Sequence, residues 1–340
     1  MRLLEGPAEG IGFPQLVRAA SNALRRCVVQ PDERVVVYTD SGGPGAMAEA
    51  IYLAAVNMGC DAVFVMAHPR FALLDPPEPA VEAMESADVV FDLASNTWSD
   101  YAPAITRICE AGTRVLQVML PPGQFVERQP TDELIGRVTR FGEICDAANE
   151  MRVTGPLGTD FSFQRGALPL DVARGLVDRP GMWDSYGVFS ISFTPPPASV
   201  NGTMVFNGPL SLLPQHKFVT REPIRTELVD GRMVKIEDDN ESASLFIRWI
   251  EQFDDDRVYQ FAHVGAGVDH RVDLDIVDVT AWESLLGAVV VGVGASSGVG
   301  LQGGEYALGH MDATLMESSL FVDGRPVIEA GRFTEDSGVV

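Results

Sequence analysis

Two residues with metal-binding side chains stand two positions apart near the end of the chain. His310 and Asp312 flank a methionine in the apolar, strand-like segment 303–312. Because successive side chains on a strand point to opposite faces, His310 and Asp312 share one face. A second histidine, His263, lies in the similar run 258–265. Two imidazoles and one carboxylate form the ligand set of mononuclear non-haem Fe(II) oxygenases, which leaves coordination positions open for substrate and O2.

The same three residues also have a purely structural explanation. A His-x-Asp pair often arises by chance, and a buried histidine can be satisfied by a backbone carbonyl. The other three histidines lie in turn-like or polar surroundings: His68 in a His-Pro turn, His216 beside Lys217, and His270 between Asp269 and Arg271. We expect these to be loop residues, although His68 could reach a crevice at the end of a parallel strand.

The elements that must position the three candidate ligands form a β-rich half of the chain. Asp-Gly pairs at 230–231 and 323–324 are typical of hairpins. One amphipathic helix is expected at 243–253, and the acidic run after it is best explained as a solvated turn. This pattern therefore predicts an α+β domain over residues 156–340 that carries all three candidate ligands. Its β runs are 188–194, 203–206, 226–229, 234–237 and 319–322.

The first half alternates β-rich apolar runs with helix-like segments. A helix is expected at 46–58 with Gly59 as its C-terminal stop, and another at 131–151. Near-continuous apolar strands joined through helices indicate a parallel sheet covered on both faces. We therefore expect a doubly wound α/β domain over residues 1–155. Its strands are 34–39, 62–67, 88–93 and 114–119.

Two glycine-rich segments leave alternatives open. Thr39 to Gly45 follows the first strand, where a Rossmann domain would bind phosphate, but it lacks the G-x-G-x-x-G spacing and the P-loop lysine. A strand-to-helix turn with Asp40 or Ser41 as the helix cap explains it as well. Gly294 to Gly300 could place backbone N–H groups near a ligand, or it could be a flexible surface loop.

Composition excludes several classes of protein. The chain has 340 residues, of which 46% are hydrophobic, and a net charge of -23. It can bury a sizeable interior, and it would repel nucleic acid and anionic membrane surfaces. The apolar window 285–301 is too short and too rich in glycine for a membrane span. The four cysteines show no metal or disulfide spacing, and the first residues do not resemble a signal peptide, so we expect reduced thiols and a cytoplasmic protein.

Four segments of the second half resemble a known family. They look like corresponding stretches of 2,5-dihydroxypyridine 5,6-dioxygenase, an enzyme that shares its fold with the aminopeptidase T family of metallopeptidases. The resemblance runs from about residue 30 to the C-terminus, and only these segments are specific. They are 179–184, 200–206, 253–267 and 303–312.

The resemblance implies that His263, His310 and Asp312 bind one Fe(II). It weighs against peptidase activity, because the aminopeptidase pattern uses two metals and several glutamates. One of those glutamates stands where this chain has His263, and the segment matching 187–194 holds no acidic residue here. A two-metal hydrolase needs ligands for both ions.

The chain also departs from the dioxygenase pattern. A glutamate and two histidines of that enzyme are replaced here by Ala173, Ser185, and Tyr101 or Trp98. Such groups would handle substrate protons, so their replacement puts the substrate in question. Tyr101, Ser185 and His270 are the remaining candidates for acid–base or hydrogen-bonding roles.

The sequence therefore predicts an Fe(II)-dependent, extradiol-type ring-cleaving dioxygenase. Its partners would be a hydroxylated aromatic or N-heteroaromatic small molecule and O2, and we expect a homo-oligomer. The alternatives are a metal-dependent hydrolase of the aminopeptidase T type, and a small-molecule binding protein that has kept the fold.

Overall fold

The chain divides into two compact units that interleave along the sequence. The computed structural model describes residues 11–70, 75–95, 99–212, 216–273, 279–299 and 304–340. The first unit comprises Met1–Thr131, Ala173–Val188 and Gly298–Gly300, and the second comprises the remainder. The sequence predicts a single boundary after residue 155. The chain instead returns to the first unit after residue 172, because a short strand there pairs with the first unit's sheet.

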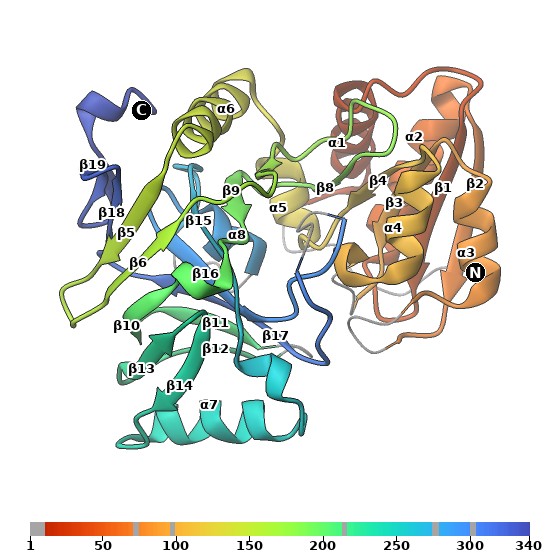
Figure 1. The fold of residues 1–340 in the computed structure, drawn as a ribbon. Coiled ribbons are helices and arrows are strands. Elements are labelled where there is room, and N and C mark those ends of the chain that lie inside the picture. Colours follow the sequence, from red (N-terminus) through yellow and green to blue (C-terminus); the bar gives the residue numbers. More distant parts are fainter. Residues whose placement is uncertain (1–10, 71–74, 96–98, 213–215, 274–278, 300–303) are drawn as a thin grey trace. The chain divides into compact units, whose positions relative to one another are not determined.

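The first unit is built on a parallel sheet in the order β2-β1-β3-β4-β8 (Figure 1). The chain leaves β1 for one neighbour and returns to the other, which is the order typical of doubly wound sheets. The four strands expected from the sequence are confirmed, and β8 is an addition. The strands are β1 (Arg34–Asp40), β2 (Asp61–Ala67), β3 (Val89–Leu93), β4 (Arg114–Gln117) and β8 (Trp183–Ser185).

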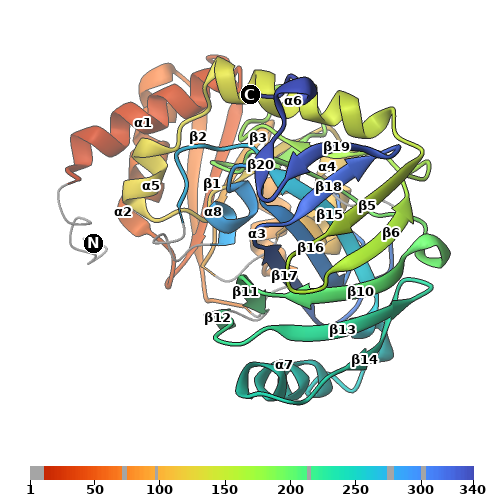
Figure 2. The same ribbon diagram turned by 90° about the vertical axis from the view of Figure 1, so that its left-hand side faces the viewer.

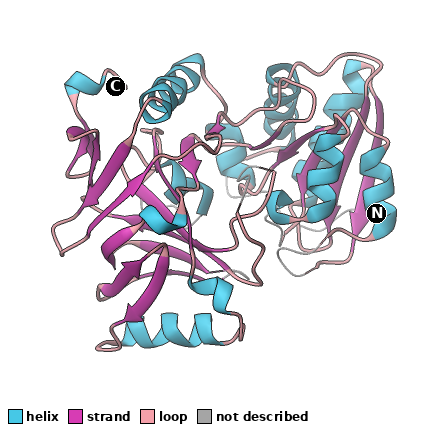
Figure 3. Cartoon of the chain, viewed as in Figure 1, coloured by secondary structure: helices cyan, strands magenta, loops and turns pink. Residues whose placement is uncertain are grey.

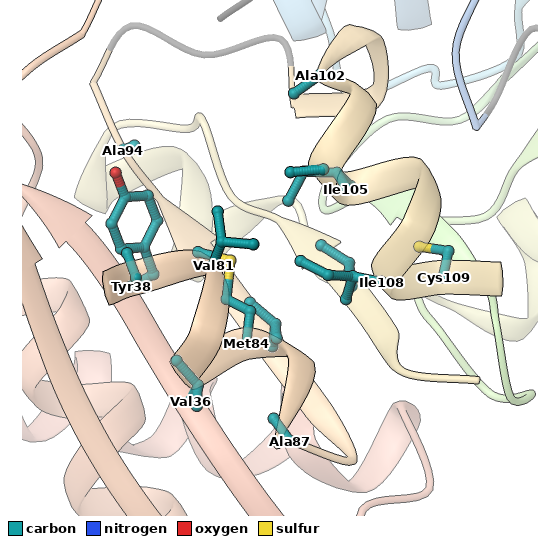
Figure 4. Packing of buried hydrophobic residues seen from close by; sticks show 14 residues of the cluster. Val36, Tyr38, Val81, Met84, Ala87, Ala94, Ala102, Ile105, Ile108 and Cys109 are labelled. Carbon is teal, nitrogen blue, oxygen red and sulfur yellow. The ribbon is translucent and has the colours of Figure 1, made fainter. Parts of the chain in front are cut away.

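Helices pack on both faces of this sheet. On one face, Val81 and Met84 of α3 meet Ile105 and Ile108 of α4 over the central strands (Figure 4). On the other, α2 packs against β1 and β2 and ends at Gly59, whose φ of 98° closes the helix as expected. The helices are α1 (Phe13–Arg26), α2 (Gly45–Met58), α3 (Glu78–Glu85), α4 (Pro103–Glu110) and α5 (Pro122–Glu127).

The glycine-rich turn after β1 is organised by Asp40. Its Oδ1 accepts a hydrogen bond from the Gly42 N–H at 2.8 Å, and its Oδ2 accepts from the backbone and hydroxyl of Ser95 at 2.8 and 3.0 Å. This carboxylate therefore ties the end of β1 to the end of β3, which favours the structural explanation of the segment over nucleotide binding.

The second unit contains two mainly antiparallel sheets (Figure 2). One has the order β14-β13-β10-β6-β5-β18-β19-β20. Both predicted Asp-Gly turns are confirmed, with Asp230 and Asp323 at positive φ between paired strands. The strands are β5 (Glu150–Thr154), β6 (Asp160–Gln164), β10 (Asn201–Phe206), β13 (Ile224–Val229), β14 (Arg232–Ile236), β18 (Ser319–Val322), β19 (Arg325–Glu329) and β20 (Arg332–Phe333).

The other sheet has the order β12-β11-β17-β16-β15-β9-β7 and carries the candidate ligands. This sheet packs against the eight-stranded sheet of the same unit through aromatic rings. The ring centroids of Phe161 and Phe261 lie 5.8 Å apart, and those of Phe163 and Phe193 lie 6.0 Å apart. Its strands are β7 (Asp171–Ala173), β9 (Ser190–Phe193), β11 (Pro209–Leu212), β12 (His216–Val219), β15 (Phe261–Gly267), β16 (Val289–Gly294) and β17 (His310–Leu315).

In the described part of the second unit strands predominate, and three α-helices accompany them (Figure 3). They are α6 (Asp132–Asp146), α7 (Glu241–Glu251) and α8 (Val279–Ser284). The helix predicted at 131–151 ends at Asp146, so that prediction is wrong for the residues after it. From Glu150 the side chains alternate between exposed and buried, and the segment pairs with β6 and β18 as β5. None of the helices in the described ranges is long and apolar enough to cross a membrane.

Candidate metal centre

Three adjacent strands bring His263, His310 and Asp312 together. In the antiparallel register, Gly292 of β16 lies between His263 of β15 and Asp312 of β17, and Gly294 lies opposite His310. The three ligand residues therefore project from the same face, as the His-x-Asp spacing predicts for the last two. One potential ligand atom from each lies within 4.8 Å of the others, and all three side chains are buried.

The donor atoms are spaced as they would be around one ion. The Nε2 atoms of His263 and His310 lie 2.8 and 3.1 Å from Oδ1 of Asp312. Two ligand atoms bound at about 2.1 Å and at right angles would be separated by about 3.0 Å. The two imidazoles lie 5.4 Å apart between ring centroids, with an angle of 22° between their planes.

The hydrogen bond of His310 fixes which of its nitrogens can bind a metal. Its Nδ1 lies 2.8 Å from the carbonyl oxygen of Ala295, and because a carbonyl can only accept, this nitrogen carries the proton. Nε2 of His310 therefore faces the Asp312 carboxylate oxygen, and either a proton or a metal ion must lie between these two atoms. A metal ion can replace that proton, so this arrangement fits a bound metal.

The carboxylate of Asp312 is held in its charged form. Burial by itself would raise the pKa of this group, but the charge of His310 and the hydrogen bonds of both imidazoles outweigh burial and keep the pKa well below its ordinary value. The site thus offers one anionic ligand and two imidazole ligands. In the described part of the chain, Oδ2 of Asp312 and Nδ1 of His263 are buried without a hydrogen-bond partner.

The absence of a side chain at Gly292 makes room for the ring of His263. A Cβ atom at this position would lie 2.2 Å from both Cδ2 and Nε2 of His263, far inside van der Waals contact. The imidazole therefore rests directly on the backbone of β16. On the same face, Thr314 donates a hydrogen bond to the carbonyl of Trp282 at 3.3 Å, which anchors α8 over the sheet next to the ligands.

Two of the other candidate residues belong to the first unit, and His270 belongs to the second. Tyr101 ends a buried 3-10 turn (Ser99–Tyr101) and Ser185 ends β8, and both belong to the first unit. The hydroxyl of Ser185 is buried and has no partner among the described residues. His270 follows β15, is exposed, and accepts a hydrogen bond from Arg137 at 3.0 Å.

Four other residues were considered for roles in the site or in loops. Trp98 lies outside the described residues. Ala173 is buried at the end of β7, where no side chain could handle a proton. His68 is an exposed residue directly after β2, as expected for a turn, and His216 begins β12 rather than lying in a loop.

Sequence reasoning did not identify two residues that shape the site. Gly292 is one of several glycines in an apolar run, and only the strand register shows that it lies under His263. Ala295 acts through its backbone carbonyl, which no side-chain pattern reveals. The sequence leaves open whether the glycine-rich segment that begins at Gly294 offers N–H groups to a ligand or forms a flexible surface loop. Its described contribution is instead a carbonyl that orients a ligand residue.

The chain matches one family over most of its length. The profile of the 2,5-dihydroxypyridine 5,6-dioxygenase family matches residues 15–335. A 2,5-dihydroxypyridine 5,6-dioxygenase from Pseudomonas putida KT2440 is 27% identical over 263 residues, which cover 74% of this chain and 72% of that protein.

Two solved structures have the same fold. The 2,5-dihydroxypyridine dioxygenase from Pseudomonas putida KT2440 superposes with a TM-score of 0.84 at 23% identity, covering 95% of this chain and 98% of that one. AmpT from Thermus thermophilus superposes with a TM-score of 0.66 at 14% identity, covering 94% and 99%. The fold relationship that the sequence resemblance implies is confirmed.

Proposed function

Because this chain belongs to the 2,5-dihydroxypyridine 5,6-dioxygenase family, we propose that it is an Fe(II)-dependent enzyme that cleaves the ring of a hydroxylated aromatic or N-heteroaromatic compound with O2. The family match and the relative from Pseudomonas putida support the class of ring-cleaving dioxygenase. The observation that carries the metal dependence is the convergence of two imidazoles and one carboxylate on a single buried point.

The protein's own residues would prepare the site for the metal and the substrate. When bound, the iron supplies open coordination positions for a substrate oxygen and for O2, and the electronic coupling between them. His263 and His310 offer neutral nitrogen ligands, and the Ala295 carbonyl keeps His310 in the tautomer that can bind. A single carboxylate leaves one positive charge of a divalent ion unbalanced, which favours a deprotonated substrate hydroxyl.

Proton handling would rest on residues other than the metal ligands. We retain Tyr101 and Ser185 as candidates, because both are buried hydroxyl-bearing side chains and Ser185 has no described partner for its hydroxyl. The exposure of His270 and its contact with Arg137 make it the weakest of the three candidates. The substitutions relative to the pyridine enzyme lead us to expect a substrate different from 2,5-dihydroxypyridine.

The aminopeptidase alternative has less support. The likeness to AmpT is a likeness of fold, and fold does not determine chemistry. A two-metal hydrolase needs ligands for two ions about 3.5–4 Å apart. Within the described ranges, only one group of three potential ligands converges.

Metal analysis and oxygen uptake test the proposal on one preparation. Protein purified without oxygen should contain about one iron per chain, and a panel of dihydroxybenzenes and hydroxypyridines should include a compound whose ring absorbance disappears with equimolar O2 uptake. Aminoacyl substrates should be inert. Release of amino acids without O2 uptake, stimulated by Zn²⁺ or Co²⁺, would overturn the proposal in favour of a hydrolase.

A further inference from the structure

The two imidazoles of the cluster are held in different ways. His310 donates the proton of its second ring nitrogen to the Ala295 carbonyl. Nδ1 of His263 is buried and has no hydrogen-bond partner in the described ranges. A histidine that binds a metal almost always donates its other ring N–H to an acceptor, which fixes the ring orientation and the tautomer. A hydrogen-bond acceptor for the Nδ1–H of His263 is therefore expected beside the ring.

The contacts of the His263 ring show where that partner must lie. Cδ2 and Nε2 are the ring atoms nearest Gly292 of β16, and Nε2 faces Asp312 on β17 beyond it. The two nitrogens of an imidazole point in diverging directions, so Nδ1 points away from β17 and toward the side of β9, which is the other neighbour of β15. The acceptor should therefore come from β9 or from the residue that directly follows it.

The strand register identifies one residue in that place. Gly265 pairs with Ser192 and Val264 with Phe193, so the next step places Thr194 opposite His263. Directly opposed residues of an antiparallel pair point to the same face, with Cβ atoms about 4.5–5.5 Å apart. Thr194 is 6% exposed, and its Oγ1 is also buried without a partner among the described residues.

We propose that Thr194 is a positioning residue for His263. Its hydroxyl accepts a hydrogen bond from the Nδ1–H of His263, either directly after rotation about χ1 or through one water molecule. Thr194 also borders a cavity of about 550 Å³, which provides room for such a water. The interaction leaves the Nε2 lone pair of His263 directed at Asp312 and the ion. The inference rests on the proposed metal centre.

Three variants and a metal titration test this role without relying on enzyme turnover. Thr194→Val keeps the shape of the side chain and removes the hydroxyl, whereas Thr194→Ser keeps the hydroxyl. Ser192→Ala is the matched control, because it removes a hydroxyl from the same strand at a position opposite Gly265. We expect Thr194→Val to weaken Co²⁺ and Zn²⁺ binding about 10- to 100-fold, and the other two variants to bind as the wild type does.

Nuclear magnetic resonance of the Zn²⁺-loaded wild type provides a readout that needs no variant. The Nδ1–H of His263 should exchange slowly with water and, if the bond is direct, show a nuclear Overhauser effect to the Thr194 methyl group. In Thr194→Val this proton should exchange fast. Undiminished metal affinity in a folded Thr194→Val protein, or fast exchange of the proton in the wild type, overturns the inference.

Co²⁺ binding by the wild type and by two variants separates the role of Thr194 from the existence of the metal centre. If His263→Ala loses Co²⁺ binding while Thr194→Val retains it, the metal centre stands and the role of Thr194 is refuted. If the wild type binds no divalent ion, the metal centre is refuted and the role of Thr194 with it.

Discussion

Replacement of Gly292 by alanine should disable the proposed metal centre without altering any candidate ligand. The new Cβ would lie 2.2 Å from Cδ2 and Nε2 of His263 and 2.9 Å from Cε1, whereas ordinary contacts begin at 3.4 Å. The ring must therefore retreat by about 1.2 Å. Metal–ligand distances tolerate deviations of about 0.2 Å, so Nε2 cannot retreat that far and remain a ligand. The backbone of Gly292 imposes no additional strain, since its φ is not positive.

The size of the effect follows from the number of ligands. Changes that only disturb the groups supporting a ligand cost about 10- to 100-fold in metal affinity. Displacement of one of three ligands should cost at least about 100-fold, or about 2.7 kcal/mol of binding free energy. Titration with Co²⁺, followed by its absorption bands or by calorimetry, measures this loss directly.

A matched control and a double-mutant cycle make the result specific. Gly136→Ala in α6 is the control, because a Cβ there would meet nothing within 4 Å, and it should leave metal affinity unchanged. Gly292→Ala should also destabilise the protein, and His263→Ala should relieve that destabilisation by removing the ring that clashes. Additive effects on unfolding free energy, or wild-type metal affinity in Gly292→Ala, would refute this account of the site.

Three further changes test other parts of the molecule. Asp312→Asn removes the carboxylate of the candidate cluster and should abolish iron retention after anaerobic dialysis while the fold persists; unchanged iron content would show that another carboxylate serves. Tyr101→Phe and Ser185→Ala should retain iron and lower kcat/KM about 10-fold; normal turnover in both would remove them from the reaction. Burial raises the pKa of Asp92 from 3.8 to about 6, although hydrogen bonds from Ala94 and Ser99 lower it. Between about pH 4 and pH 6 the unfolded chain releases this proton and the native state keeps it, so the free energy of unfolding falls as the pH rises through this range. Asp92→Asn should therefore gain up to about 3 kcal/mol in urea unfolding at pH 8 and nothing near pH 4, and an equal gain at both would contradict the assignment.

Local patterns in the sequence were sufficient to predict β1 to β4, two hairpin turns and the shared face of two candidate ligands. The apolar runs of the first half form β1 to β4 within one or two residues of their predicted bounds. The hairpin turns at Asp230 and Asp323 follow from the positive φ that Asp-Gly pairs accommodate. The shared face of His310 and Asp312 follows from the two-residue period of a strand alone. These features depend on neighbours in the sequence, so they could be predicted without a structure.

Two features could not be predicted from the sequence, because strand pairing with distant residues overrides the local pattern there. The helix predicted to reach residue 151 stops at Asp146, because the alternating residues from Glu150 gain two strand partners. Trp183 to Ser185 form a strand of the first unit's sheet only because β4 offers an open edge there. A segment of three residues carries no pattern of its own that would reveal such pairing.

The sequence alone determined the type of chemistry, because the kinds of ligand residue and the family resemblance can be seen in the order of the amino acids. Tertiary structure decided the geometry of the candidate metal site. The pairing of β15, β16 and β17 sets His263 beside Asp312, although 49 positions separate them in the chain. The same pairing places Gly292 beneath the imidazole, and the loop after β16 brings the Ala295 carbonyl to His310. Register between strands is fixed by the packing of whole faces, so these contacts exist only once the sheet has formed.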